Sequence, residues 1–141
     1  MASAANSKLN TKNSALVLFA HGARDAQWSE PMRAIQQAVA GRRSDLTVEL
    51  AFLEIMKPTL GEAVADLART GHTTVTIAPL FLAQGGHLKR DLARLVADLR
   101  ARHPASEIDV LPAIGEVDEL VHAISDWLVN SAPRRQMISL P

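Results

Sequence analysis

Short apolar runs alternate with segments of helical spacing along most of the chain, and this alternation predicts the order of its elements. Residues 15–20 (ALVLFA) form an unbroken apolar run, which is typical of a strand buried on both faces. Further strands are predicted over 46–53 (LTVELAFL), over 73–82, which opens on the β-branched run TTVTI, and over 108–111.

Segments of helical period lie between these strands, and capping signals mark where they begin. Ser29 stands just before a first turn that holds Pro31, which predicts a helix start, and Gly41 is predicted to end that helix. Thr59 and Glu62 have the spacing of a capping box, in which each side chain accepts a hydrogen bond from the other's backbone N–H. A second helix is therefore predicted to begin at Thr59.

Glycines mark the remaining helix boundaries. Gly71 is placed to end the second helix. Gly85 and Gly86 form a turn before a third helix, whose leucines recur at helical spacing. The last helix is predicted over 116–130, with buried positions at Leu120, Ile124, Trp127 and Leu128.

The order βαβαβαβα predicts an α/β fold, a small doubly wound parallel sheet of four strands with helices on both faces. The expected strand order is the flavodoxin-like 2-1-3-4. One domain is predicted over 15–130. Two segments outside it, a disordered polar tail over 1–14 and a C-terminal tail over 131–141, lack the pattern.

Composition and charge exclude several classes of partner and chemistry. The 141 residues carry 15 basic and 15 acidic side chains, and a balanced charge argues against nucleic acid or an anionic membrane as partner. No apolar run approaches the roughly 18 residues of a membrane helix, and the N-terminus lacks a secretory pattern, so a cytoplasmic location is expected. Because there is no cysteine, any metal must be held by His, Asp or Glu.

Three potential metal ligands follow three of the predicted strands. His21 follows the first strand, Glu54 the second and His87 the third. With strand order 2-1-3-4, His21 is central at the carboxyl edge of the sheet, where ligands bind in such folds. Two imidazoles and a carboxylate suit Co²⁺, Ni²⁺, Fe²⁺ or Zn²⁺ and leave coordination positions open. Taken alone, each histidine has an alternative interpretation as a structural residue that forms hydrogen bonds. Glu54 alone has an alternative interpretation as a solvated loop carboxylate.

Cations and glycines at the same edge suit an anionic ligand. Lys89 and Arg90 stand in the first turn of the third helix, where positive charge opposes the helix dipole, and Arg24 follows the first strand. Backbone N–H groups after Gly85 and Gly86 offer an alternative use of this edge, the binding of a phosphate or nucleotide. No GxGxxG or Walker pattern supports that alternative.

Three segments carry a family resemblance, and together they span about residues 15–128. They are 20–25 (AHGARD), 51–54 (AFLE) with Pro58, and 79–91 (PLFLAQGGHLKRD). The chain resembles the short, single-domain form of the CbiX-type sirohydrochlorin chelatases. It departs from the family pattern at Ala20 and Ala23, where the family usually has Gly and Ser.

The resemblance implies an activity and its partners. The family inserts a divalent metal into sirohydrochlorin without ATP, in cobalamin or sirohaem biosynthesis. Co²⁺ is the expected metal and Fe²⁺ or Ni²⁺ are alternatives. No cofactor is expected beyond this substrate metal, and the short form is expected to pair as a homodimer. A non-catalytic carrier of the metal or the tetrapyrrole on the same scaffold remains the alternative function.

The resemblance also implies roles for individual residues. His21, His87 and Glu54 are expected to bind the incoming metal and to accept the protons that leave the pyrrole nitrogens. The many carboxylates of the substrate are expected to meet basic side chains, and its ring to meet apolar ones and the glycine turn. The predicted substrate-binding residues are Arg24, Lys89, Arg90, Phe81, Leu82, Gly85 and Gly86.

Overall fold

The computed structural model describes residues 13–135. The two predicted tails therefore lie largely outside the described residues. Where they are described, Ser14 is the first residue of a strand and Ser131 the last residue of a helix.

Four parallel strands form one sheet in the order β2-β1-β3-β4. This order confirms the predicted fold class. The central strand β1 pairs with β2 on one side, as at Leu18 opposite Leu50, and with β3 on the other, as at Val17 opposite Ile77. The strands are β1 (Ser14–Ala20), β2 (Thr47–Phe52), β3 (Thr74–Pro79) and β4 (Glu107–Val110).

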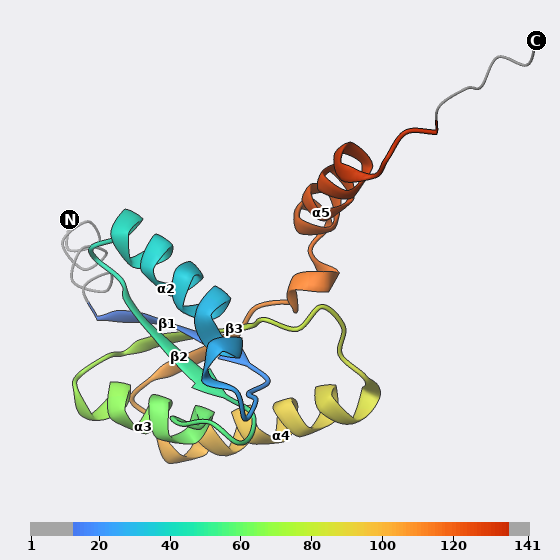
Figure 1. The fold of residues 1–141 in the computed structure, drawn as a ribbon. Helices are drawn as coiled ribbons and strands as arrows, with labels where there is room; N and C mark the ends of the chain where they lie inside the picture. The colour runs from blue at the N-terminus through green and yellow to red at the C-terminus, as the bar shows by residue number, and fades with distance from the viewer. Residues whose placement is uncertain (1–12, 136–141) are drawn as a thin grey trace, which may run out of the picture.

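Helices cover both faces of this sheet, as predicted. Helix α2 lies on one face, and α3 and α4 lie on the other (Figure 1). A short 3-10 helix, η1, precedes α2, and a second one, η2, separates β4 from the last helix, α5. The helices are η1 (Ala26–Ser29), α2 (Glu30–Arg42), α3 (Leu60–Arg69), α4 (Gly86–Arg102), η2 (Ile114–Glu116) and α5 (Asp118–Ser131).

Each face of the sheet has its own hydrophobic core. Under α3 and α4, Phe19 and Ile77 pack with Val64 and are almost completely buried. On the α2 side, Leu18 and Phe52 form the smaller core. Burial on both faces explains why the first strand reads as an unbroken apolar run.

Local signals fix several boundaries where the sequence predicts them. Thr59 and Glu62 form the capping box, with the Glu62 N–H donating to the Thr59 hydroxyl at 3.2 Å. Gly71 follows α3 with a φ of 91°, which a glycine adopts without strain. The prediction that Gly41 ends the first helix is wrong, because α2 continues through Gly41 to Arg42. A single glycine costs an exposed helix only about 1 kcal/mol, so packing of the rest of α2 outweighs it.

The third strand is shorter than predicted. It ends at Pro79 rather than at Leu82, because its partner β1 ends at Ala20. The last link is the Leu80 N–H, which donates to the Phe19 carbonyl at 2.8 Å. Phe81 and Leu82 therefore belong to the loop that carries the predicted site residues.

The last helix is placed differently from the prediction. Helix α5 stands clear of the sheet (Figure 1) and has no buried residue, so the expected burial of its apolar positions is wrong. Among residues 13–135, no helix is long and apolar enough to cross a membrane. The apolar positions that stay exposed are Leu120, Ile124, Trp127 and Leu128.

Candidate functional site

The loops that carry the candidate residues leave the carboxyl edge of the sheet, as predicted. His21 comes directly after β1, and Glu54 lies two residues after β2. His87 is the second residue of α4, beyond the loop that follows β3. Parallel strands bring the first two of these loops together because β1 and β2 are neighbours.

The loops after β1 and β2 are joined through their backbones. The Glu54 N–H donates to the His21 carbonyl at 3.1 Å, and the Leu53 N–H donates to the Ala20 carbonyl at 2.8 Å. Gly22 has a φ of 96°, and a Cβ on this residue would lie 2.0 Å from the Glu54 carbonyl oxygen. The close approach of the two loops therefore requires glycine at this position.

The imidazole of His21 lies against a buried aromatic ring. Its centroid is 5.7 Å from that of Phe81, at an interplanar angle of 71°. Phe81 is in turn edge-on to Phe19 at 5.5 Å, and both phenyl rings are buried. The His21 ring nitrogens have no hydrogen bond or ion pair with any other residue among 13–135, and the residue is exposed. They are therefore free to meet a proton or a metal ion.

The loop that presents Glu54 is braced at both ends. The Glu54 carbonyl accepts from the Met56 N–H at 2.7 Å, and Ile55 between them has a φ of 69°. The Phe52 N–H donates to the Pro58 carbonyl at 2.9 Å. These bonds fix the backbone around Glu54, while the residue itself stays exposed.

His87 is placed apart from the other two candidates. Its Nδ1 lies 3.3 Å from Nη2 of Arg90, and because a guanidinium only donates, Nδ1 accepts in this arrangement. The loop after β3 extends away from the sheet before α4 begins. The start of α4 therefore lies well away from the ends of β1 and β2 (Figure 1). No group of three or more His, Asp or Glu within 13–135 is close enough to hold one metal ion. The structure thus joins the loops of His21 and Glu54 and leaves His87 outside that pair.

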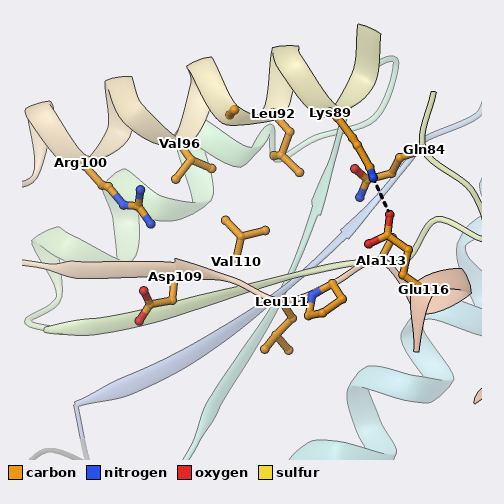
Figure 2. A pocket seen from close by; sticks show the side chains of 12 residues that line it. Gln84, Lys89, Leu92, Val96, Arg100, Asp109, Val110, Leu111, Ala113 and Glu116 are labelled. Carbon is orange, nitrogen blue, oxygen red and sulfur yellow. Dashed lines mark ion pairs between the residues drawn. The ribbon is translucent and has the colours of Figure 1, made fainter. Parts of the chain in front are cut away.

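The predicted basic residues differ in their surroundings. Lys89 Nζ forms an ion pair with Oε1 of Glu116 at 3.0 Å (Figure 2). Arg24 is exposed and makes no ion pair within the described part of the chain; the neighbouring Asp25 instead accepts the Gln27 N–H at 2.9 Å and caps η1. Glu116 is not among the residues predicted from the sequence, because no local pattern links it to Lys89.

The predicted apolar and glycine residues lie in the loop between β3 and α4 or at its end. Phe81 is 6% exposed, whereas Leu82 is 65% exposed and offers an apolar surface to a ligand. Gly85 caps α4 with its backbone, and Gly86 is the first helical residue. The first turn of α4 has no side-chain cap, which leaves its N–H groups to water or a ligand.

One hollow of the described structure reaches this edge at Gln84 and Lys89 but does not extend to the loops after β1 and β2. A groove of about 520 Å³ lies between α4 and β4, where Leu92, Val96 and Val110 face one another (Figure 2). It includes neither His21 nor Glu54. His21 and Glu54 therefore lie on an open shelf outside this groove, whereas Lys89 lines it.

Comparison with known proteins identifies the family. The CbiX family model matches residues 15–130. The chain belongs to the CbiX family. A Methanosarcina barkeri protein named sirohydrochlorin cobaltochelatase is 32% identical over 87 residues, which cover 62% of this chain and 67% of the relative. A Saccharolobus islandicus protein of the same name is 32% identical over 102 residues, 70% of this chain and 78% of the relative.

Solved structures of CbiX-type proteins have the same fold. A CbiX protein from Marinobacter aquaeolei VT8 matches with a TM-score of 0.70 at 29% identity, over 83% of this chain and 93% of that one. The sirohydrochlorin chelatase SirB from Bacillus subtilis subspecies spizizenii, solved in complex with cobalt, matches with a TM-score of 0.70 at 25% identity. The match covers 84% of this CbiX-family chain but 51% of SirB, so the chain corresponds to about half of SirB.

Proposed function

We propose that this CbiX-family chain is a sirohydrochlorin chelatase, which inserts a divalent metal ion into the tetrapyrrole without ATP. Co²⁺ is the expected metal, since the similar Methanosarcina and Saccharolobus proteins are named cobaltochelatases, and Fe²⁺ and Ni²⁺ are the alternatives. The observation that carries the proposal is the His21 imidazole, held edge-on to Phe81 with its nitrogens unpartnered among residues 13–135.

Metal insertion requires a base at the site. The incoming M²⁺ replaces two pyrrole N–H protons, so two protons must leave the macrocycle for each metal that enters. Histidine is the side chain that titrates in the neutral range, and its neutral form both accepts a proton and binds these metals. We assign this role to His21, with the Glu54 carboxylate on the adjoining loop as the oxygen ligand.

His87 is proposed as the second active-site imidazole, brought to the metal when substrate spans the edge. In the free chain its Nδ1 is occupied by Arg90. A substrate carboxylate that draws the Arg90 guanidinium away frees this nitrogen, because an ionised acceptor attracts the guanidinium more strongly than an imidazole does. Arg24 and Lys89 are the other proposed carboxylate partners, and Phe81, Leu82, Gly85 and Gly86 the proposed contacts of the ring.

We further propose a homodimer located in the cytoplasm. The site is an open shelf, and a broad macrocycle is better enclosed when a second copy covers the other side. A cytoplasmic location agrees with a chain that has no cysteine and so gains no disulfide from an oxidising compartment.

The test of function is the anaerobic absorbance of sirohydrochlorin mixed with Co²⁺, without protein, with the chain, and with its His87→Ala variant. A matched control is His103→Ala, because His103 ends α4 at the opposite edge of the sheet. The proposal expects faster metallation with the chain and with His103→Ala, and a rate near background with His87→Ala. If the chain binds the ring but the rate stays at background, the chain is a carrier and not a chelatase.

A further inference from the structure

The apolar contacts proposed above for the tetrapyrrole all lie between β3 and the first turn of α4. His21 leans toward this side of the sheet, because its imidazole packs edge-on against Phe81, which belongs to the core under α3 and α4. A broad macrocycle centred on His21 also extends over the opposite face, which carries α2. Apolar side chains at the carboxyl edge of that face are therefore placed to contact the other half of the ring.

Three half-buried apolar side chains, Trp28, Met56 and Leu80, lie at this edge and are called the Trp28 cluster below. They stand in the segments that follow β1, β2 and β3. All three pack against the smaller core, which includes the last residues of β1 and β2. Since neighbouring strands lie about 4.8 Å apart, the ends of three adjacent strands span roughly 10 Å. The cluster is therefore one apolar surface rather than three scattered residues.

The backbone that carries Trp28 is fixed by η1. This short helix links the loop after β1 to α2, so it lies at the carboxyl edge, because α2 returns to the other edge before β2 begins. The Trp28 N–H donates to the Asp25 carbonyl at 3.1 Å. The Ser29 hydroxyl is buried, donates to the Ala26 carbonyl at 2.9 Å and accepts from Nε of Arg33 at 3.3 Å. Trp28 therefore stands on a backbone that is held on both sides.

The indole of Trp28 keeps both an accessible surface and a free donor. The side chain is half-buried, and its Nε1–H donates to no residue among 13–135. Tryptophan combines a large flat apolar surface with one polar donor, and that donor usually finds a partner when it is removed from water. An indole in this state suits a ligand that is itself flat and aromatic and carries hydrogen-bond acceptors at its rim.

Cations lie on the elements that carry the cluster. Arg24 stands in the loop after β1 and makes no ion pair within the described part of the chain. Lys57 stands in the loop after β2, with its Nζ 4.0 Å from Oε1 of Glu62 and its side chain 81% exposed. A ring with carboxylates at its periphery therefore meets apolar side chains beneath it and positive charge beside them.

We propose that the Trp28 cluster is a second apolar surface for the tetrapyrrole, on which the ring stacks against Trp28 while its carboxylates meet Arg24 and Lys57. The macrocycle then lies across the ends of the strands, with Phe81 on one side of the sheet and the Trp28 cluster on the other. The inference rests on the proposed function for the identity of the ligand. It concerns binding of the ring and not insertion of the metal, so it is tested without metal.

Binding of metal-free sirohydrochlorin, followed anaerobically by its absorbance, tests this surface. Trp28→Ala removes the indole and is expected to raise the Kd about tenfold or more, whereas Trp28→Phe keeps a flat aromatic ring and recovers most of the affinity. In the metallation assay Trp28→Ala raises KM and changes kcat little. Val39→Ala is the matched control, because Val39 is half-buried against the same core but lies in the last turn of α2. This variant loses stability and keeps the wild-type Kd.

Urea unfolding first establishes conditions in which every variant is folded. A folded Trp28→Ala variant with the wild-type Kd overturns the proposal. An equal loss of affinity in Val39→Ala also overturns it, because the effect then comes from the core and not from contact with the ring. If the chain binds the ring without metallating it and Trp28→Ala weakens that binding, the cluster is supported and the chelatase assignment fails. A wild-type chain that binds no sirohydrochlorin overturns both.

Discussion

The backbone N–H of Glu54 donates to the carbonyl of His21 at 3.1 Å, so two proposed site residues from different strands share one hydrogen bond. This link depends on the close approach of Gly22 to Glu54. The relative position of the two loops that carry the imidazole and the carboxylate is thus fixed by their backbones. Substitutions that separate these loops are therefore expected to lower activity even when the substituted residue does not itself contact the substrate.

Gly22→Ala tests that link. The added Cβ would lie 2.0 Å from the Glu54 carbonyl and impose a φ of 96° on alanine, so we expect a loss of stability of about 1–3 kcal/mol and a large loss of activity. Urea unfolding and the metallation rate measure the two effects. Gly41→Ala is the control: Gly41 lies in α2 with open space around it, so alanine is expected to raise stability by about 0.5–1 kcal/mol.

The contact of Phe81 with His21 is expected to position the imidazole. Phe81→Leu removes the ring edge against His21, whereas Phe19→Leu opens a comparable gap in the same core without touching His21. Both variants are expected to lose stability, but only Phe81→Leu is expected to slow metallation, by about tenfold or more. Equal rates for the two variants, measured well below their unfolding temperatures, would show that the contact does not orient His21.

Because Lys89 forms an ion pair with Glu116, substitutions of these two residues are expected to have opposite effects on substrate binding. Both side chains are about half exposed, so breaking the pair is expected to change stability by no more than about 1 kcal/mol. Glu116→Gln frees Lys89 for a substrate carboxylate and is expected to lower KM, whereas Lys89→Ala is expected to raise it. Both differences should shrink at high salt. A KM that moves the same way in both variants contradicts a role for Lys89 in binding.

A pH-dependent contribution to stability is expected at Asp45. Its carboxylate accepts two hydrogen bonds of 2.9 Å from the Arg43 guanidinium, which hold the pKa of Asp45 below its usual value of 3.8. The contribution is therefore present above about pH 3.8 and is lost as pH falls through the lower pKa of the folded state. Urea midpoints of the wild type and Asp45→Asn are expected to differ slightly at pH 7 and to converge as the pH falls below 3.8 through the lowered pKa of the folded state. A difference that grows on acidification contradicts this assignment.

Most of the fold could be predicted from the sequence because the decisive signals are local. The unbroken apolar run of β1, the capping box at Thr59 and the glycine after α3 each act within a few residues. The position of α5 could not be predicted in this way. Its apolar stripe predicts burial, but such a stripe does not specify where the helix lies relative to its own sheet, and in the described structure it is exposed.

The candidate site was predicted to a similar extent. Strand order alone places His21 beside Glu54, and the backbone bond between them confirms the shared edge. The positive φ of Gly22 and the pairing of Lys89 with Glu116 depend on contacts between distant segments, which spacing along the chain does not reveal. The same holds for His87, whose place depends on the path of the loop after β3. That His21, Glu54 and His87 act together stays a prediction.

The measurement that tests the central claim most directly is the initial rate of Co²⁺ insertion into sirohydrochlorin by the wild type, His21→Ala and His103→Ala. Circular dichroism and urea unfolding first establish that the variants are folded. If His21 accepts pyrrole protons and binds the metal, His21→Ala falls to the rate without protein, while His103→Ala keeps the wild-type rate. A folded His21→Ala variant with wild-type turnover would contradict the assignment of this edge as the active site.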